Sequence, residues 1–278
     1  MINPDSTDKA TAAAGNAVAE FTQTFFLSAG EANAQQEMSL PSLTSRIIDI
    51  ATAHANSLGI GNPAMEARGC GWVLSRLAIE MSRYPKVNET YSVTTWIESW
   101  NRHFSVRDFM IADAAGTPVG YAVSVWMVLD TRTRENAGLS HLSLPDCMVS
   151  SRKCPAGRPG RHPVVVDAGH EDPLPWGSVR ATAPGVVRTF GYADLDFYRH
   201  VNTVRYVTML LNRFSLREMD ETLINRLDIA FMREGRYDEP VKVLRADSGL
   251  HTVLSMADCA DGTPLLSASV SRLPRNLS

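Results

Sequence analysis

Two segments of the chain follow the same pattern, and this internal duplication constrains the fold more than any other feature of the sequence. Ala112–Pro118 leads into an alternating run at Tyr121–Val125, and Ala257–Pro264 leads into a second at Leu266–Val270. Each segment joins a turn rich in Asp and Gly to a strand pattern, which predicts a β-hairpin. Because several matches recur in the same order, the sequence indicates two copies of one structural unit.

Each copy also carries one helical pattern ahead of its strands. In the second copy, Val204–Phe214 has an apolar stripe at helical spacing. In the first, Ser39 or Ser42 can cap a helix that ends at Gly59. Its apolar face is formed by Leu43, Ile47, Ile50 or Ala51, His54 and Leu58. A long helix with little charge, followed by antiparallel strands, predicts a sheet wrapped around a central helix, so we expect an α+β protein with two such units.

The two units are joined by a segment with many prolines. Proline cannot donate to a sheet ladder and interrupts helices, so 146–187 is predicted to be a linker. Val164–Val166 within it has the pattern of a short edge strand. The expected organisation is a disordered tail at 1–19, an N-terminal unit at 20–145, the linker at 146–187 and a C-terminal unit at 188–278.

The composition excludes several classes of function. A net charge of −3 and a charged fraction of 21% give no electrostatic reason to expect a nucleic-acid partner. The apolar runs are too short to cross a bilayer and the first residues lack a secretory pattern, so we expect a cytoplasmic protein without membrane insertion. The sequence has no Gly-rich phosphate loop and no cysteine or histidine pair at metal-ligand spacing, so we expect neither a metal nor a cofactor.

The residues from Asp194 to Asn202 carry the strongest chemical signal. Asp196 precedes His200 by four residues, and a helical pattern begins directly afterwards. This arrangement places a general base beside the unpaired backbone N–H groups of a helix start. Glu234, on a predicted strand farther along, can complete a set that directs water at a polarised carbonyl. The pattern therefore favours hydrolysis of an acyl ester or thioester.

Each of these residues also has a structural interpretation. Asp196 can orient the imidazole of His200 or cap the helix, and Asn202 is a cap or turn residue as readily as a catalytic one. His200 can be a buried structural histidine, and Glu234 can pair with a neighbouring arginine. Tyr198 can pack with an idle hydroxyl or act directly. The sequence leaves open whether Glu234 or His200 removes the proton from water.

Two blocks of sequence carry a resemblance to a known family. They consist of Gly71–Leu77, Arg83–Pro85 and Tyr91–Trp96 in the first half, and of Asp194–Asn202, Tyr206 and Arg233–Glu234 in the second. This combination resembles the acyl-acyl carrier protein thioesterases, the plant fatty-acyl type and its bacterial relatives. The similarity extends from about Phe21 to Leu273. It implies two hotdog domains in tandem, each an antiparallel β-sheet wrapped around a long central helix.

The resemblance also implies roles for individual residues. Asp196, His200 and Glu234 match the family's active-site aspartate, histidine and glutamate. Tyr198 stands where the family usually has an asparagine. Gly235 stands where many plant members have a cysteine, so a thiolate nucleophile is excluded at that position. The first unit lacks an equivalent set, which implies one active site per chain, in the second unit.

The first unit is expected to house the acyl tail. Ile47, Ile50 and His54 on the first helix are predicted to form walls of its channel. Burial of each methylene contributes roughly 0.8 kcal/mol, so the depth of such a channel sets a chain-length preference.

The expected function is hydrolysis of fatty acyl-acyl carrier protein thioesters to free fatty acid and carrier protein. Two alternatives remain open: a thioesterase for coenzyme A esters, and a non-catalytic acyl-binding protein, for which Tyr198 is the best argument. A hotdog dehydratase fits these residues poorly. We expect a monomer or a homodimer, because two units in one chain can already pair with each other. A basic cluster in the linker is either a solvated loop or a docking surface for an acidic carrier protein; it consists of Arg152, Lys153, Arg158 and Arg161.

Overall fold

The computed structural model describes residues 19–140, 142, 148–169 and 173–275, so the tail expected at 1–19 lies outside the described residues except for Ala19. The N-terminal half consists of β1 (Glu20–Phe26), a 3-10 turn (Ala29–Glu31), α1 (Leu40–Ser57), α2 (Asn62–Glu66), β2 (Cys70–Met81), β3 (Thr90–Trp100), β4 (Ser105–Asp113) and β5 (Pro118–Asp130). The rest consists of β6 (Val164–Val166), β7 (Ser178–Arg180), β8 (Ala183–Thr189), a 3-10 turn (Tyr192–Asp194), α3 (Thr203–Leu211), α4 (Leu216–Glu221), β9 (Thr222–Phe231), β10 (Pro240–Ser248), β11 (His251–Asp258) and β12 (Pro264–Pro274).

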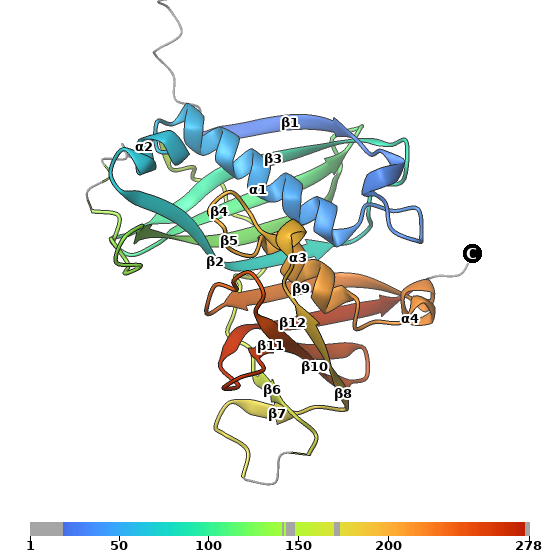
Figure 1. Cartoon of the computed structure of the whole chain (residues 1–278). Coiled ribbons are helices and arrows are strands. Elements are labelled where there is room, and N and C mark those ends of the chain that lie inside the picture. Colours follow the sequence, from blue (N-terminus) through green and yellow to red (C-terminus); the bar gives the residue numbers. More distant parts are fainter. Residues whose placement is uncertain (1–18, 141, 143–147, 170–172, 276–278) are drawn as a thin grey trace, which may run out of the picture.

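A ten-stranded antiparallel sheet runs through both halves of the chain (Figure 1). Its strand order is β1-β3-β4-β5-β2-β9-β12-β11-β10-β8. Counted outward from the join of β2 and β9, the first half reads β2-β5-β4-β3-β1 and the second β9-β12-β11-β10-β8, so the two halves have the same strand order. The two halves meet where β2 pairs with β9, with Leu77 opposite Ile229. Both predicted hairpins are confirmed, as β4–β5 and β11–β12. The predicted α+β architecture of two sheet units with a helix each is confirmed as well.

The helix α1 begins and ends where the sequence predicts. The Ser39 side chain accepts a hydrogen bond from the Ser42 N–H and caps the helix, and Gly59 follows it with φ +72°. The apolar stripe of the second helix extends to Phe214, but the helix α3 is shorter and ends at Leu211. Phe214 nevertheless remains buried in the same hydrophobic core.

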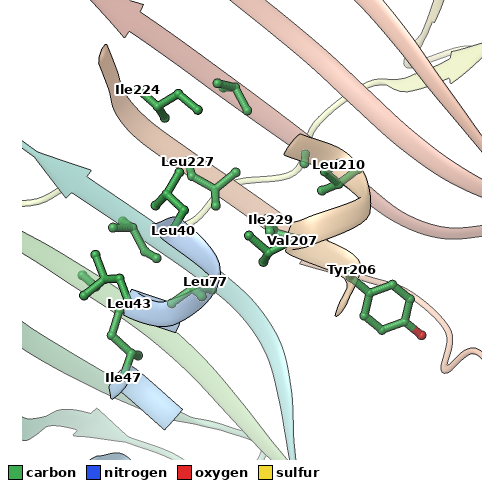
Figure 2. Close-up of a cluster of buried hydrophobic side chains, with 14 of the residues drawn as sticks. Leu40, Leu43, Ile47, Leu77, Tyr206, Val207, Leu210, Ile224, Leu227 and Ile229 are labelled. Atoms are coloured by element: carbon green, nitrogen blue, oxygen red, sulfur yellow. The ribbon is translucent and has the colours of Figure 1, made fainter. Parts of the chain in front are cut away.

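One hydrophobic core serves both halves. Figure 2 shows Leu43 of α1 and Leu77 of β2 in the same cluster as Val207 of α3 and Ile229 of β9. Leu77 and Ile229 face each other where β2 pairs with β9, so the join between the two halves is part of this core. Burial of a side chain of this size contributes about 1.5–3 kcal/mol, which stabilises the join. The two helices also contact each other, and the elements that carry the candidate site are therefore held against the N-terminal half.

The linker lies across the face of the sheet that points away from α1. Three of its backbone N–H groups donate to carboxylates on three strands of the sheet, β4, β2 and β9: Cys154 to Asp108, Gly157 to Glu80 and Gly160 to Asp228. Val164–Val166 does form a strand, as predicted. However, it pairs with β7 in a separate two-stranded parallel sheet, not with an edge of the large sheet.

Candidate active site

A cavity of about 1000 Å³ lies where the two halves meet. Its N-terminal walls are formed by residues of α1, β2, β4 and β5, including Ala51, Leu74 and Trp126. Its C-terminal walls are formed by the loop before α3 and the loop after β9. A volume of this size is at the upper end of the range of small-molecule sites. Asp196, Tyr198, His200, Asn202 and Glu234 all line it, so the structure brings the five sequence-predicted residues to one space.

A tight loop presents His200 to the cavity. The Asp196 N–H donates to the His200 carbonyl at 2.8 Å, and Asp196 Oδ1 accepts from the N–H groups of Tyr198 and His200 at 2.9 and 3.1 Å. Arg199 occupies the left-handed region with φ +66°, which only a few per cent of non-glycine residues adopt. The Asp196 carboxylate therefore fixes the backbone that carries His200. Its hydrogen bonds go to this loop, not to the imidazole, and α3 is capped instead by Asn202, whose side chain accepts from the Val204 N–H at 2.9 Å.

Glu234 lies in the loop directly after β9, and the prediction that it is part of a strand is wrong. The strand ends at Phe231 because the chain turns to meet the start of α3. The Gly235 N–H donates to the Tyr206 hydroxyl at 2.6 Å, and the Gly235 carbonyl accepts from the Val201 N–H at 3.1 Å. These two bonds hold the loop of Glu234 against the loop of His200.

The carboxylate of Glu234 and the imidazole of His200 face each other. His200 Nε2 lies 3.5 Å from Glu234 Oε2, which is an ion-pair distance once the ring is protonated. The same oxygen binds the guanidinium of Arg134, which follows β5 in the N-terminal half. The neighbouring Arg233 does not neutralise Glu234, because it pairs with Glu239 and with Asp258. The resulting row of cation, carboxylate and imidazole spans the two halves.

Two hydrogen-bond donors in the segment from Tyr198 to Thr203, around His200, have no acceptor among the described residues. The N–H groups of Val201 and Asn202 are already bonded to Gly235 and Asp194, but the Thr203 N–H is not engaged. The Tyr198 hydroxyl is buried and has no partner. Burial, together with the negative charges of Glu66 and Asp196, raises the pKa of Tyr198, so the hydroxyl keeps its proton at neutral pH. The Thr203 N–H can donate to an oxygen in the cavity, and the Tyr198 hydroxyl can do so after a shift of its side chain, because the hydroxyl itself is buried.

The predicted channel walls are placed differently from the expectation. Ile47, Ile50 and His54 are fully buried, but they do not line this cavity; Ala51 and Ala55 of the same helix do. Ile47 and Ile50 pack into the shared core instead. His54 stacks on Phe21 and binds Arg107. The helix is rotated so that Ile47 and Ile50 pack into the core, while a different face, which includes Ile48 and Ala55, borders the cavity.

The basic cluster of the linker is largely neutralised by carboxylates of the sheet. Arg152 pairs with Glu20 and lies over the ring of Trp96, while Lys153 and Arg158 both pair with Glu98. These contacts fix the linker to the sheet. The geometry therefore favours an anchoring role over a free docking surface.

Sequence reasoning missed two arginines at the cavity, Arg134 and Arg107. Arg134 carries no motif signal, because it becomes relevant only through the contact between the halves. Arg107 had a signal that could be read: it lies on the inward face of β4, two residues from Phe109, in a position where a core residue is expected. Within the described part of the chain, no cluster of His, Cys, Asp and Glu is suited to hold a metal, and no helix is both long and apolar enough to cross a bilayer.

The fold and the cavity agree with the comparisons to known proteins. The chain has the architecture of a tandem hotdog protein. The model of the acyl-ACP thioesterase N-terminal domain matches residues 18–140, and that of the acyl-ACP thioesterase C-terminal domain matches residues 187–260. The chain therefore belongs to the acyl-ACP thioesterase family.

Relatives of known sequence and structure support this assignment. The chain is 26% identical over 265 residues to the acyl-[acyl-carrier-protein] hydrolase FATB3 of Cuphea viscosissima, covering 91% of this chain and 59% of that protein. It is 23% identical to the palmitoyl-acyl carrier protein thioesterase of Arabidopsis thaliana, and the match covers 82% of this chain and 55% of that protein. The chain thus spans little more than half the length of these curated relatives.

Solved structures extend the comparison. An acyl-ACP thioesterase from Bacteroides thetaiotaomicron superposes with a TM-score of 0.80 at 26% identity, covering 91% of this chain and 98% of that one. The 12:0-ACP thioesterase from Umbellularia californica gives a TM-score of 0.72 at 20% identity, with coverage of 94% and 100%, and shares the fold.

Proposed function

We propose that this chain hydrolyses thioesters between fatty acyl groups and an acyl carrier protein, releasing free fatty acid and carrier protein. The observation that carries the proposal is the meeting of His200 and Glu234, 3.5 Å apart, beside a helix start in a cavity of about 1000 Å³. Family membership supplies the substrate class. The acyl chain extends from this pair into the part of the cavity formed by the N-terminal half, and the carrier protein stays outside.

His200 is the general base in this mechanism. It takes a proton from water as the water oxygen bonds to the carbonyl carbon, and Glu234 stabilises the imidazolium that forms. The developing oxyanion is bound by the Thr203 N–H at the start of α3, where the helix dipole favours negative charge, and by the Tyr198 hydroxyl. When the tetrahedral intermediate collapses, the carbon–sulfur bond breaks and His200 returns the proton to the thiolate. Asp196 and Asn202 hold the backbone that positions these groups.

Turnover of a matched pair of variants tests the assignment. His200→Ala and Glu234→Gln are each expected to lower kcat about 10²- to 10⁴-fold, the usual loss for a positioned acid–base group. Thermal melts confirm that both variants fold. Glu239→Gln, which alters a neighbouring carboxylate that binds Arg233, serves as the control and should retain turnover. Near-normal kcat in both His200→Ala and Glu234→Gln refutes the mechanism.

Coenzyme A esters are the alternative substrate within the same chemistry. Parallel assays with one acyl group on coenzyme A and on a carrier protein separate the two. A kcat/KM that is clearly higher for the carrier-bound ester supports the proposal. A preference for the coenzyme A ester would replace it.

Tyr198 is the observation that favours a non-catalytic acyl-binding protein, since the family's usual asparagine is absent. If the hydroxyl binds the oxyanion, Tyr198→Phe should lower kcat about 10²-fold with a small change in KM, as measured for other donors of this kind. Tyr198→Asn, the family residue, should retain most of the activity. Tight acyl binding without any release of fatty acid from the wild-type chain would establish the acyl-binding function.

A further inference from the structure

The cavity contains a buried positive charge that the hydrolytic mechanism does not use. Arg107 on β4 lines the cavity, although the residue is only 5% exposed. Its Nη1 donates to His54 Nδ1 at 2.8 Å and to Thr95 Oγ1 at 3.3 Å. Among the described residues, no carboxylate lies within ion-pair distance of this guanidinium, and burial is the sole influence on its pKa. The pKa falls to about 10, so the group stays charged at neutral pH.

The remaining donors of Arg107 are available to a ligand. Nε and Nη2 donate to no protein atom of the described chain, and the side chain that carries them borders the cavity. Ser105, which faces the same side of β4, also lines the cavity, as do Thr52 and Asn56 of α1. This gives the cavity a polar wall with a fixed cation.

The polar wall lies well away from the proposed reaction centre. In the sheet, β4 is separated from β9 by β5 and β2, and Glu234 directly follows β9. Three strand spacings correspond to about 14 Å. A ligand group that reaches Arg107 therefore belongs to the distal part of an acyl chain whose thioester lies beside His200.

An all-hydrocarbon chain is a poor complement to this wall. Burying a cation without a partner costs several kcal/mol, and a terminal methyl group would leave the donors of Arg107 unpaired. An oxygen acceptor satisfies them. A carboxylate fits best, because the Nε and Nη2 donors of a guanidinium match its two oxygens.

We propose that Arg107 forms a subsite for an acyl group that carries a carboxylate at its distal end, with a distal hydroxyl as a weaker ligand of the same kind. The inference rests on the proposed function, since it names the acyl class that the hydrolytic site accepts. It does not alter the chemistry at His200 and Glu234.

Turnover of thioesters that differ only at the chain end tests the subsite. Three substrates of equal length end in a methyl, a hydroxyl or a carboxylate group. The wild-type chain should show a kcat/KM for the carboxylate at least about 10-fold above that for the methyl end, because a charged hydrogen bond contributes about 1.5–3 kcal/mol. Arg107→Met should reverse this order. Leu74→Met, which changes the cavity wall without changing charge, should preserve it.

Binding without turnover separates this inference from the proposed function. Methyl esters of a fatty acid and of a dicarboxylic acid of the same length are added to intact protein, and the shift in melting temperature is measured. The ester with a free distal carboxylate should stabilise the wild-type chain more, and Arg107→Met should remove the difference. Arg107→Lys, which keeps the charge but loses the paired donors, should give an intermediate shift if Arg107→Met fails to fold.

Two results would overturn the inference. One is a wild-type chain that prefers the methyl-ended substrate and ligand in both assays. The other is an Arg107→Met variant that changes only the preferred chain length, which would make Arg107 a neutral end wall.

Discussion

Arg134 forms an ion pair with Glu234, so a side chain of the N-terminal half holds the candidate carboxylate of the C-terminal half. Arg134 lies in the turn after β5 with φ +62°, and its N–H donates to the Asp130 carbonyl at 2.9 Å. The carboxylate oxygen that it binds is also the one nearest to His200 Nε2. The geometry of the His200–Glu234 pair therefore depends on both halves of the chain.

We expect Arg134→Ala to lower kcat by about 10- to 100-fold with little change in KM. The reason is that Glu234 loses the contact that fixes its rotamer, and small misplacements of a reacting group cost up to about 10²-fold. The ion pair is partly exposed, so its loss should change the free energy of unfolding by no more than about 1 kcal/mol. Steady-state kinetics and thermal melts measure the two effects.

Two further variants show whether the loss of kcat in Arg134→Ala comes from the missing positive charge or from the missing contact that positions Glu234. Arg134→Lys retains a cation and should recover part of kcat. Arg132→Ala removes an exposed arginine two residues away, for which no ion pair is seen among the described residues, and should behave like the wild type. Equal kcat losses in Arg132→Ala and Arg134→Ala would mean that the whole turn matters and the ion pair does not.

Asp196 is expected to act through the backbone. Its Oδ1 accepts two N–H groups of the loop that carries His200, and an asparagine side chain offers the same acceptor. Asp196→Asn should therefore retain a substantial part of kcat, while Asp196→Ala loses about 10²-fold because the loop is no longer fixed. If both variants lose activity equally, the negative charge of Asp196 takes part in the chemistry. Steady-state kinetics of the two variants decides this.

Gly235 keeps the loop of Glu234 close to α3 because it has no side chain. A Cβ at this position would lie 2.6 Å from Phe190 Cε2 and 2.8 Å from the Tyr206 hydroxyl. Gly235→Ala should destabilise the fold by about 1–3 kcal/mol and lower kcat, because the loop must move away from His200. Gly191→Ala is the matched control, since its Cβ would meet nothing closer than Asp194 Oδ2 at 3.8 Å. Denaturant titration measures the free energy of unfolding of both variants. Equal losses of this free energy in Gly235→Ala and Gly191→Ala would contradict the explanation.

Much of the fold could be predicted from the sequence because its signals are local. The two hairpin turns and the cap at Ser39 depend on neighbouring residues, and the structure confirms them. The orientation of α1 depends instead on packing against the sheet. Ile47 and Ala51 both belong to its apolar face and to the core, and the sequence pattern does not tell that Ala51 also borders the cavity while Ile47 does not.

The candidate site was predictable in part for the same reason. Asp196 and His200 are close in sequence, so their loop could be anticipated. Glu234 was recognised as a partner, but its loop depends on the bond between Val201 and Gly235, which joins segments 34 residues apart. Arg134 comes from the other half of the chain and depends on the β2–β9 join, for which the sequence offers no signal.

The linker contact at Asp108 should make stability depend on pH. Asp108 is fully buried on β4, where Oδ2 accepts the Cys154 N–H at 3.2 Å and Oδ1 has no partner among the described residues. Burial, followed by the charge of Glu98, raises the pKa of Asp108 to about 7 from an ordinary value of 3.8. Between these two values the folded chain holds a proton that the unfolded chain has released. The contribution of Asp108 to stability is therefore greatest below pH 4 and declines as pH rises toward 7, by up to about 1.4 kcal/mol per pH unit.

Asp108→Asn tests this dependence, because an amide cannot ionise and its oxygen still accepts the Cys154 N–H. The free energy of unfolding of the variant, measured by denaturant titration from pH 4 to pH 8, should lose this decline. The difference between variant and wild type isolates Asp108, since the other titrating groups are common to both chains. The variant should therefore gain on the wild type as pH rises and be the more stable chain at pH 8. Parallel curves over this range would mean that Asp108 is ionised in the folded chain throughout, with the linker cations Lys153 and Arg158 compensating its burial.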